Sequence, residues 1–192
     1  LLKNNINFSV KNLADVIFEV TSVMSAMSEG NFKAQVTLST SGQLQQLKNN
    51  VNSSMTSVDA AISEISEVMH AIRQGNFRQR IQLPLTGQLE QLKENINSSV
   101  DNLGAVISEI ASVMSAMKRG DFSLRILASS HGQLQSLQED INTSMDITAT
   151  AIANVTEVLA GLSNGDLSRK IDQNYQGVFQ SLKNDVNQTV EK

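Results

Sequence analysis

One short sequence stretch recurs four times along the chain at a fixed interval. It begins with Gly30-Asn31-Phe32 and closes at Gly42-Gln43-Leu44, and each glycine returns in steps of 45 residues without insertions. A large apolar residue follows each opening glycine, and a β-branched residue lies four places further on. A repeat this regular predicts one structural unit that is used four times. Its defining positions are Gly30, Phe32, Val36, Gly42; Gly75, Phe77, Ile81, Gly87; Gly120, Phe122, Ile126, Gly132; and Gly165, Leu167, Ile171, Gly177.

The stretches between these motifs carry apolar residues at alternating steps of three and four. Such spacing predicts helices over 2–27, 44–72, 89–117 and 134–162, each closed by the opening glycine of the next motif, with a last helix from Val178. Apolar residues make up 40% of the chain and aromatic residues only 4%, which favours long helices with a narrow apolar seam. We therefore expect an all-α protein.

Two details of the seam predict how each long helix packs. From Leu44 to Val58 the steps run 3, 4, 4, 3, and the extra step of four turns the seam to a new helix face. In the later half of each helix, two adjacent apolar residues occupy the seam. Doubled positions are typical of a four-helix bundle. These pairs are Val23-Met24, Val68-Met69, Val113-Met114 and Val158-Leu159.

The connectors are long enough to reverse the direction of the chain. An antiparallel helix hairpin needs about 2–5 residues, whereas eleven residues separate Gly30 from Gly42. Eleven extended residues reach roughly 36 Å, and half of such a helix is about 23 Å long. The connector can therefore run back along one half-helix and start the next helix parallel to it, anchored by Phe32 and Val36. The alternative is a loose surface loop.

This order of half-helix, anchored connector and parallel half-helix resembles the HAMP domain of bacterial receptors, in particular the concatenated HAMP arrays of some chemoreceptors and sensor histidine kinases. The resemblance rests on the Gly-Asn/Asp-Phe/Leu openings, the second anchors, the Gly-Gln-Leu starts and the asparagines at 52, 97, 142 and 187. It implies tandem parallel homodimeric four-helix bundles stacked end to end, with contiguous helices joining successive units. The units would cover 11–56, 57–101, 102–146 and 147–192, and 1–10 would end a preceding second helix.

The resemblance also implies partners and a location. We expect a parallel homodimer in the cytoplasm, between input and output modules of the same chain, whether or not the parent protein is anchored in the inner membrane. Many family members carry a proline at the start of the first helix and an Asp-Glu pair opening the second. Both are missing here, so we expect no direct membrane junction and no membrane insertion of this segment.

Comparison of the four copies reveals a longer period of about 90 residues. Three seam positions alternate in residue type, whereas the connectors look alike, so we expect two kinds of bundle tied by one kind of connector. Core packing responds to single methyl groups, and odd and even units would then differ in helix rotation or offset. Drift between duplicated copies is the alternative explanation. The alternating positions are Val10, Met55, Val100, Met145; Val16, Ala61, Val106, Ala151; and Leu13, Val58, Leu103, Thr148.

Other functions find little support in the sequence. The net charge of −4 offers no basic face for nucleic acid, and we expect no cofactor, no metal site and no catalysis. His70 and His131 lack paired ligands at metal spacing, and Glu19, Glu64 and Glu109 fit a solvated face or an interhelix hydrogen bond. Asn-x-Ser/Thr triplets, such as the one at Asn52, read as polar residues that loosen the helix junction.

We therefore expect a signal-relay module that passes helix rotation or offset from an input to an output module, in chemotaxis or two-component signalling. The alternative is a passive coiled-coil rod or dimerisation spacer, although a spacer needs neither glycine connectors nor alternating cores.

Overall fold

The computed structural model describes residues 2–191, and every regular element within that range is an α-helix. This confirms the predicted all-α class. The outer limits of the predicted array, residues 1 and 192, lie outside the described residues. The helices are α1 (Leu2–Ser28), α2 (Gly42–Arg73), α3 (Gln88–Lys118), α4 (Gln133–Ser163) and α5 (Gly177–Val190). Four connectors join them, over 29–41, 74–87, 119–132 and 164–176, and are numbered here in chain order.

Each of the first four helices ends in the same glycine-dependent turn. At the end of α1, Gly30 has a φ of 81°, its N–H donates to the Met27 carbonyl at 3.0 Å, and the Asn31 N–H donates to the Ala26 carbonyl at 2.9 Å. This pair of bonds is a Schellman motif, which satisfies carbonyls that the helix leaves free. A Cβ atom at Gly30 would meet nothing within 4 Å, so the backbone conformation, and not space, requires glycine.

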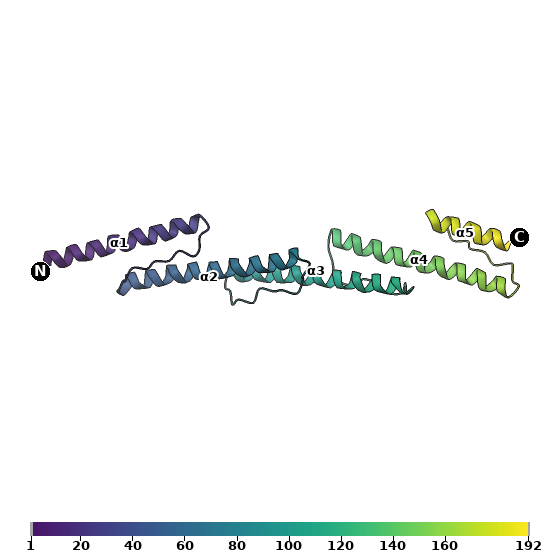
Figure 1. Cartoon of the computed structure of the whole chain (residues 1–192), viewed down its shortest axis with the longest axis horizontal. Helices are drawn as coiled ribbons and strands as arrows, with labels where there is room; N and C mark the ends of the chain where they lie inside the picture. The colour runs from purple at the N-terminus through teal and green to yellow at the C-terminus, as the bar shows by residue number, and fades with distance from the viewer. Residues whose placement is uncertain (1, 192) are drawn as a thin grey trace. The chain divides into compact units, whose positions relative to one another are not determined.

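The chain divides into two compact parts, Leu1–Asp101 and Asn102–Lys192, and each part contains two connectors. In the first part, α1 and α2 run in the same direction, and the connector between them returns along the pair (Figure 1). In the second part, α4 and α5 are arranged in the same way around their connector (Figure 1). The long connector thus reverses the chain and keeps the next helix parallel, as its length predicts.

A small apolar cluster fixes each connector. In the first cluster, Val23 comes from α1, Val36 from the connector and Met55 from α2, and all three side chains are at most 4% exposed. The other clusters have the same composition by position: one residue from the helix before, one from the connector and one from the helix after. They are Val68, Ile81 and Val100; Val113, Ile126 and Met145; and Val158, Ile171 and Val190.

The doubled seam positions separate into a buried and an exposed residue. Val23 is 4% exposed beneath its connector, whereas Met24 next to it is 46% exposed. The same contrast holds in the three later copies, where Met69, Met114 and Leu159 are 41–49% exposed. Each of the first four helices therefore has one apolar face covered by a connector and a second apolar face that is exposed within the described part of the chain.

Among the described residues, no helix is both long enough and apolar enough to cross a membrane.

Candidate functional site

An asparagine of the following helix binds each connector through both backbone groups of one residue. Asn52 Oδ1 accepts a hydrogen bond from the Val36 N–H at 2.8 Å, and Asn52 Nδ2 donates to the Val36 carbonyl at 2.9 Å. A planar side-chain amide carries one acceptor and two donors, so it can pair with an extended peptide unit as a neighbouring strand would. We call this arrangement the asparagine clamp. The other clamps pair Asn97 with Ile81, Asn142 with Ile126, and Asn187 with Ile171.

The clamp corrects the interpretation of the Asn-x-Ser/Thr triplets. Asn52, Asn97 and Asn142 do not loosen a helix junction; each holds the backbone of a buried connector residue. The constant separation of 16 residues between the second anchor and the asparagine, in all four copies, is the sequence signal that could have revealed the contact.

A glutamate of the preceding helix binds three of the four connectors from the other side. The Glu19 carboxylate accepts from the Thr37 N–H at 3.0 Å, the Thr37 hydroxyl at 2.6 Å and the Leu38 N–H at 2.9 Å. The hydroxyl of Thr37, followed by the two backbone N–H groups, lowers the pKa of Glu19. Equivalent bonds join Glu64 to Gln82 and Leu83, and Glu109 to Leu127 and Ala128.

Each of these glutamates therefore forms hydrogen bonds to a connector. The expected roles, a solvated face or a hydrogen bond between two helices, do not describe them. Together with the asparagine clamp, they tie the first three connectors to both flanking helices. In the fourth copy Asn154 replaces the glutamate, and its Nδ2 donates to the Tyr175 hydroxyl at 2.8 Å.

Charged pairs surround the clamps at the surface. Lys48 Nζ donates to the carbonyls of Thr37 and Leu38 at 3.1 and 2.8 Å. Ion pairs join Arg80 to Asp101, Arg125 to Asp146 and Lys170 to Glu191. Exposed pairs of this kind contribute little to stability, so the apolar clusters and the clamps are the main contacts that hold the connectors.

The predicted connector anchors fall into two groups by exposure. The second anchors, Val36, Ile81, Ile126 and Ile171, are 0–3% exposed. The first anchors Phe32, Phe77 and Phe122 are half-buried and pack against the clusters. Leu167 differs from these phenylalanines, because it is 57% exposed and lies outside the fourth cluster.

The predicted alternating positions also divide by exposure. Val16, Ala61, Val106 and Ala151 are all at most 3% exposed, and Met55, Val100 and Met145 are buried beneath connectors. Val58, Leu103 and Thr148 are half-buried. Val10 and Leu13 differ from their equivalents, because they are 61% and 45% exposed.

The connectors themselves alternate, which differs from the expectation of a single kind. Leu85 of the second connector and Tyr175 of the fourth pack against their clusters. The equivalent residues of the first and third connectors are small and polar: the Thr40 hydroxyl donates to Gln45 Oε1 at 2.8 Å, and the Ser130 hydroxyl donates to Gln138 Oε1 at 2.6 Å. The 90-residue period therefore includes the connectors as well as the helices.

The two histidines take no part in the asparagine clamps or in the glutamate bonds. His70 is exposed, with its ring nitrogens 3.2 Å from Arg73 Nη2 and 3.0 Å from Gln74 Nε2, and His131 is exposed.

Comparison with protein families gives a match in two places. The profile described as HAMP domain matches residues 51–105 and 139–192, which together make up more than half of the chain. Each matched range contains one complete connector, the second or the fourth. The first range adds parts of α2 and α3, and the second adds most of α4 and all of α5. A search of curated proteins found no significant match, and neither did a search of solved structures. The chain belongs to the HAMP domain family, whose members serve as linkers in signal transduction.

Proposed function

We propose that this chain is a signal-relay array that converts helix motion at one end into helix motion at the other. The observation that carries this proposal is the attachment of the first three connectors to both flanking helices. Glu19 from α1 and Asn52 from α2, for example, bond adjacent residues of the first connector. A rotation or shift of one helix would strain these bonds unless the connector and the other helix moved with it.

The long helices extend this coupling from one connector to the next. In the first part of the chain, α2 supplies Met55 to the first cluster and Val68 to the second. In the second part, α4 supplies Met145 to the third cluster and Val158 to the fourth. Because an α-helix is stiff over this length, a displacement at one connector reaches its neighbour through the shared helix.

We further propose that the array works as a parallel homodimer in which each unit is a four-helix bundle. The support is the second apolar face, which the single chain leaves open. An exposed apolar stripe along a helix is typical of a face that packs against a partner. A second copy supplies the same stripe by symmetry. The stripe includes Leu13, Ile17, Met24, Leu47, Ile62, Met69, Leu92, Ile107, Met114, Leu137, Ile152 and Leu159, which are 41–54% exposed.

The units, over 11–56, 57–101, 102–146 and 147–192, alternate in this proposal between two packing arrangements. Met55 and Met145 occur with Thr40 and Ser130 in odd units, whereas Val100 and Val190 occur with Leu85 and Tyr175 in even units. We place the array in the cytoplasm, between sensor and output domains of a chemoreceptor or a sensor kinase. A passive rod is the competing function.

Exchange of one alternating pair inside the parent receptor tests relay against rod. Val16 and Ala61 are both buried, so Val16→Ala combined with Ala61→Val keeps the total core volume while reversing the local alternation. A relay predicts a changed signalling output with dimerisation retained. Ser66→Ala, on an exposed face of α2, is the matched control and should leave the output unchanged. Wild-type output from the exchanged receptor would favour the rod.

A further inference from the structure

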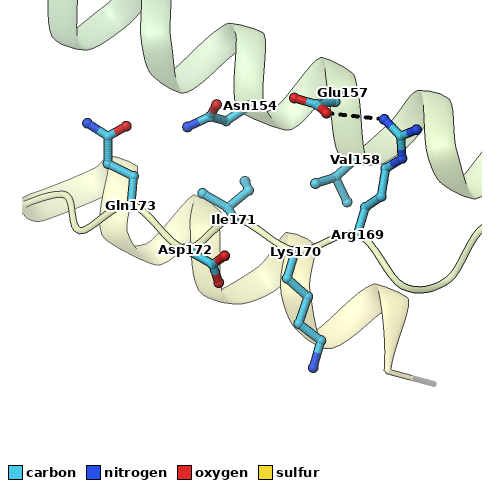
Figure 2. Close-up of a pocket in the computed structure, with 8 residues that line it drawn as sticks. All are labelled: Asn154, Glu157, Val158, Arg169, Lys170, Ile171, Asp172 and Gln173. Atoms are coloured by element: carbon cyan, nitrogen blue, oxygen red, sulfur yellow. Dashed lines mark hydrogen bonds and ion pairs between the residues drawn. The ribbon is translucent and has the colours of Figure 1, made fainter.

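A cavity of about 300 Å³ lies between α4 and the fourth connector. Asn154, Glu157 and Val158 of α4 form one wall, and residues 169–173 of the connector form the other (Figure 2). This is the place where the first three copies position a glutamate carboxylate against the connector.

In those three copies the carboxylate satisfies two consecutive backbone N–H groups. In the second copy, Glu64 Oε1 accepts from the Gln82 N–H at 3.0 Å, and Glu64 Oε2 accepts from the Leu83 N–H at 3.1 Å. Glu19 and Glu109 bond the equivalent N–H groups of the first and third connectors. The connector backbone therefore forms a carboxylate-binding surface at each of three positions related by the repeat.

The fourth copy keeps the backbone but lacks the carboxylate. Asn154 stands in place of the glutamate, and its amide is engaged with the Tyr175 hydroxyl at 2.8 Å. Within residues 2–191, the N–H groups of Asp172 and Gln173, which are the equivalents of Gln82 and Leu83, donate no hydrogen bond. The equivalent pair of N–H groups binds a carboxylate in each of the other three copies, whereas this pair has no such partner among the described residues.

The side chains around this cavity leave room for an anion. The Asp172 carboxylate points away from α4 (Figure 2), so it does not occupy the space above its own N–H. Glu157, the other acid at the cavity, is paired with Arg169 Nη1 at 3.1 Å. Arg169 lies against Gly161, where a Cβ atom would come within 2.7 Å of the arginine Cδ, so this glycine gives the guanidinium group its place beside the helix.

We propose that the fourth connector is a binding site for a carboxylate group from outside the connector, held by the N–H groups of Asp172 and Gln173. A carboxylate matches the site because its two oxygens can accept from two consecutive N–H groups, as Glu64 does in the second copy. The same chemistry is available in a free small carboxylate and in a glutamate side chain of another protein. The site is separate from the exposed apolar stripe and does not depend on the proposed relay.

Amide NMR of the full chain tests the site with two probes. Acetate represents the free carboxylate, and N-acetylglutamate with a blocked α-carboxyl represents a protein side chain; each is added at constant ionic strength against chloride. We expect saturable downfield shifts at the Asp172 and Gln173 N–H signals, with no response at Gln82 and Leu83, where Glu64 already fills the site. Equal binding of both probes means that the site recognises the carboxylate group and nothing else of the ligand. If the glutamate probe binds and acetate does not, the source of the carboxylate is a protein side chain. Absence of a response to both probes would overturn the proposal.

Two variants make the test reciprocal. Asn154→Glu combined with Tyr175→Leu recreates the residues of the second copy and should abolish the response at Asp172 and Gln173, because an internal carboxylate then occupies the site. Glu64→Asn should open the second connector and create a new response at Gln82 and Leu83. Binding that persists in the double variant would contradict the assignment. So would Gln82 and Leu83 signals that do not respond in a folded Glu64→Asn chain. The same spectra report whether each variant is folded.

Discussion

Asn52 and Val36 share two hydrogen bonds across a separation of 16 residues, one to the N–H and one to the carbonyl of a residue that is 1% exposed. A buried peptide unit outside regular secondary structure must find partners for both groups. This asparagine supplies both at once, and it comes from the helix that the connector leads into. The clamp therefore links the path of the connector to the position of the next helix.

Removal of one clamp should destabilise its unit. Asn97→Ala leaves the N–H and carbonyl of Ile81, a residue that is 1% exposed, without their partner. An unsatisfied buried polar group costs about 1–3 kcal/mol, so we expect the free energy of unfolding to fall by that amount in chemical denaturation. Ser98→Ala, on the neighbouring exposed position, is the control and should have little effect. Equal stability of the two variants would show that the clamp contributes nothing.

The glycine at the helix end should be required for its conformation. Gly75 has a φ of 76°, and a Cβ atom there would meet nothing within 4 Å. Left-handed backbone costs a non-glycine residue about 1–2 kcal/mol, so Gly75→Ala should lower the free energy of unfolding by about that much. Gly75→Asn should cost less, because asparagine tolerates this region better than alanine. The reverse order of the two variants would contradict the assignment.

Acid should weaken the end of α4 through Asp166. The hydroxyl and N–H of Ser168, followed by Arg169, lower the pKa of Asp166 from 3.8 to about 2. A lowered pKa in the folded state means that the contribution to stability is complete above pH 3.8 and is lost as the pH falls through about 2. Asn31 and Asn76 form the same turn with an amide, so Asp166→Asn should keep the turn and remove only the charge.

The thermal midpoint, measured against pH, checks this prediction. The difference in thermal midpoint between wild type and Asp166→Asn should be constant from neutral pH down to about pH 4. It should then disappear as the pH falls from 3.8 to about 2. A difference that is independent of pH throughout would refute the role of the charge.

The exposed apolar stripe should control dimerisation. Ile62 is 43% exposed on the stripe, and Ile62→Asp would place a charge in the proposed interface. Sedimentation equilibrium should then show a shift from dimer toward monomer. Leu127 of the third connector is 81% exposed and off the stripe, so Leu127→Asp is the matched control and should leave the mass unchanged. A dimer that tolerates both substitutions would exclude the stripe as the interface.

Much of this fold could be predicted because the relevant signals are local. The spacing of Leu44, Leu47 and Val51 predicts a helix, and Gly75 predicts its end, from residues a few places apart. The return path also follows from local facts, since the number of residues between Gly30 and Gly42 limits where the next helix can start.

The contacts of the polar residues could not be predicted in the same way. Asn52 and Glu19 are separated from their connector partners by 16–19 residues, and their roles depend on which helix face the connector covers. The sequence shows that Thr40 and Leu85 differ. It does not show that Leu85 packs into a core, because that depends on residues of the flanking helices that are distant in sequence. Tertiary placement decides both cases.

If odd and even units pack in two different ways, spin-label distances between the two copies of a dimer should reveal it. The chain has no cysteine, so single cysteines can be placed at Thr21, Ser66, Ala111 and Thr156, which are exposed and equivalent in the four repeats. We expect labels at 21 and 111 to give one intersubunit distance and labels at 66 and 156 to give another. One common distance at all four positions would show that odd and even units pack alike.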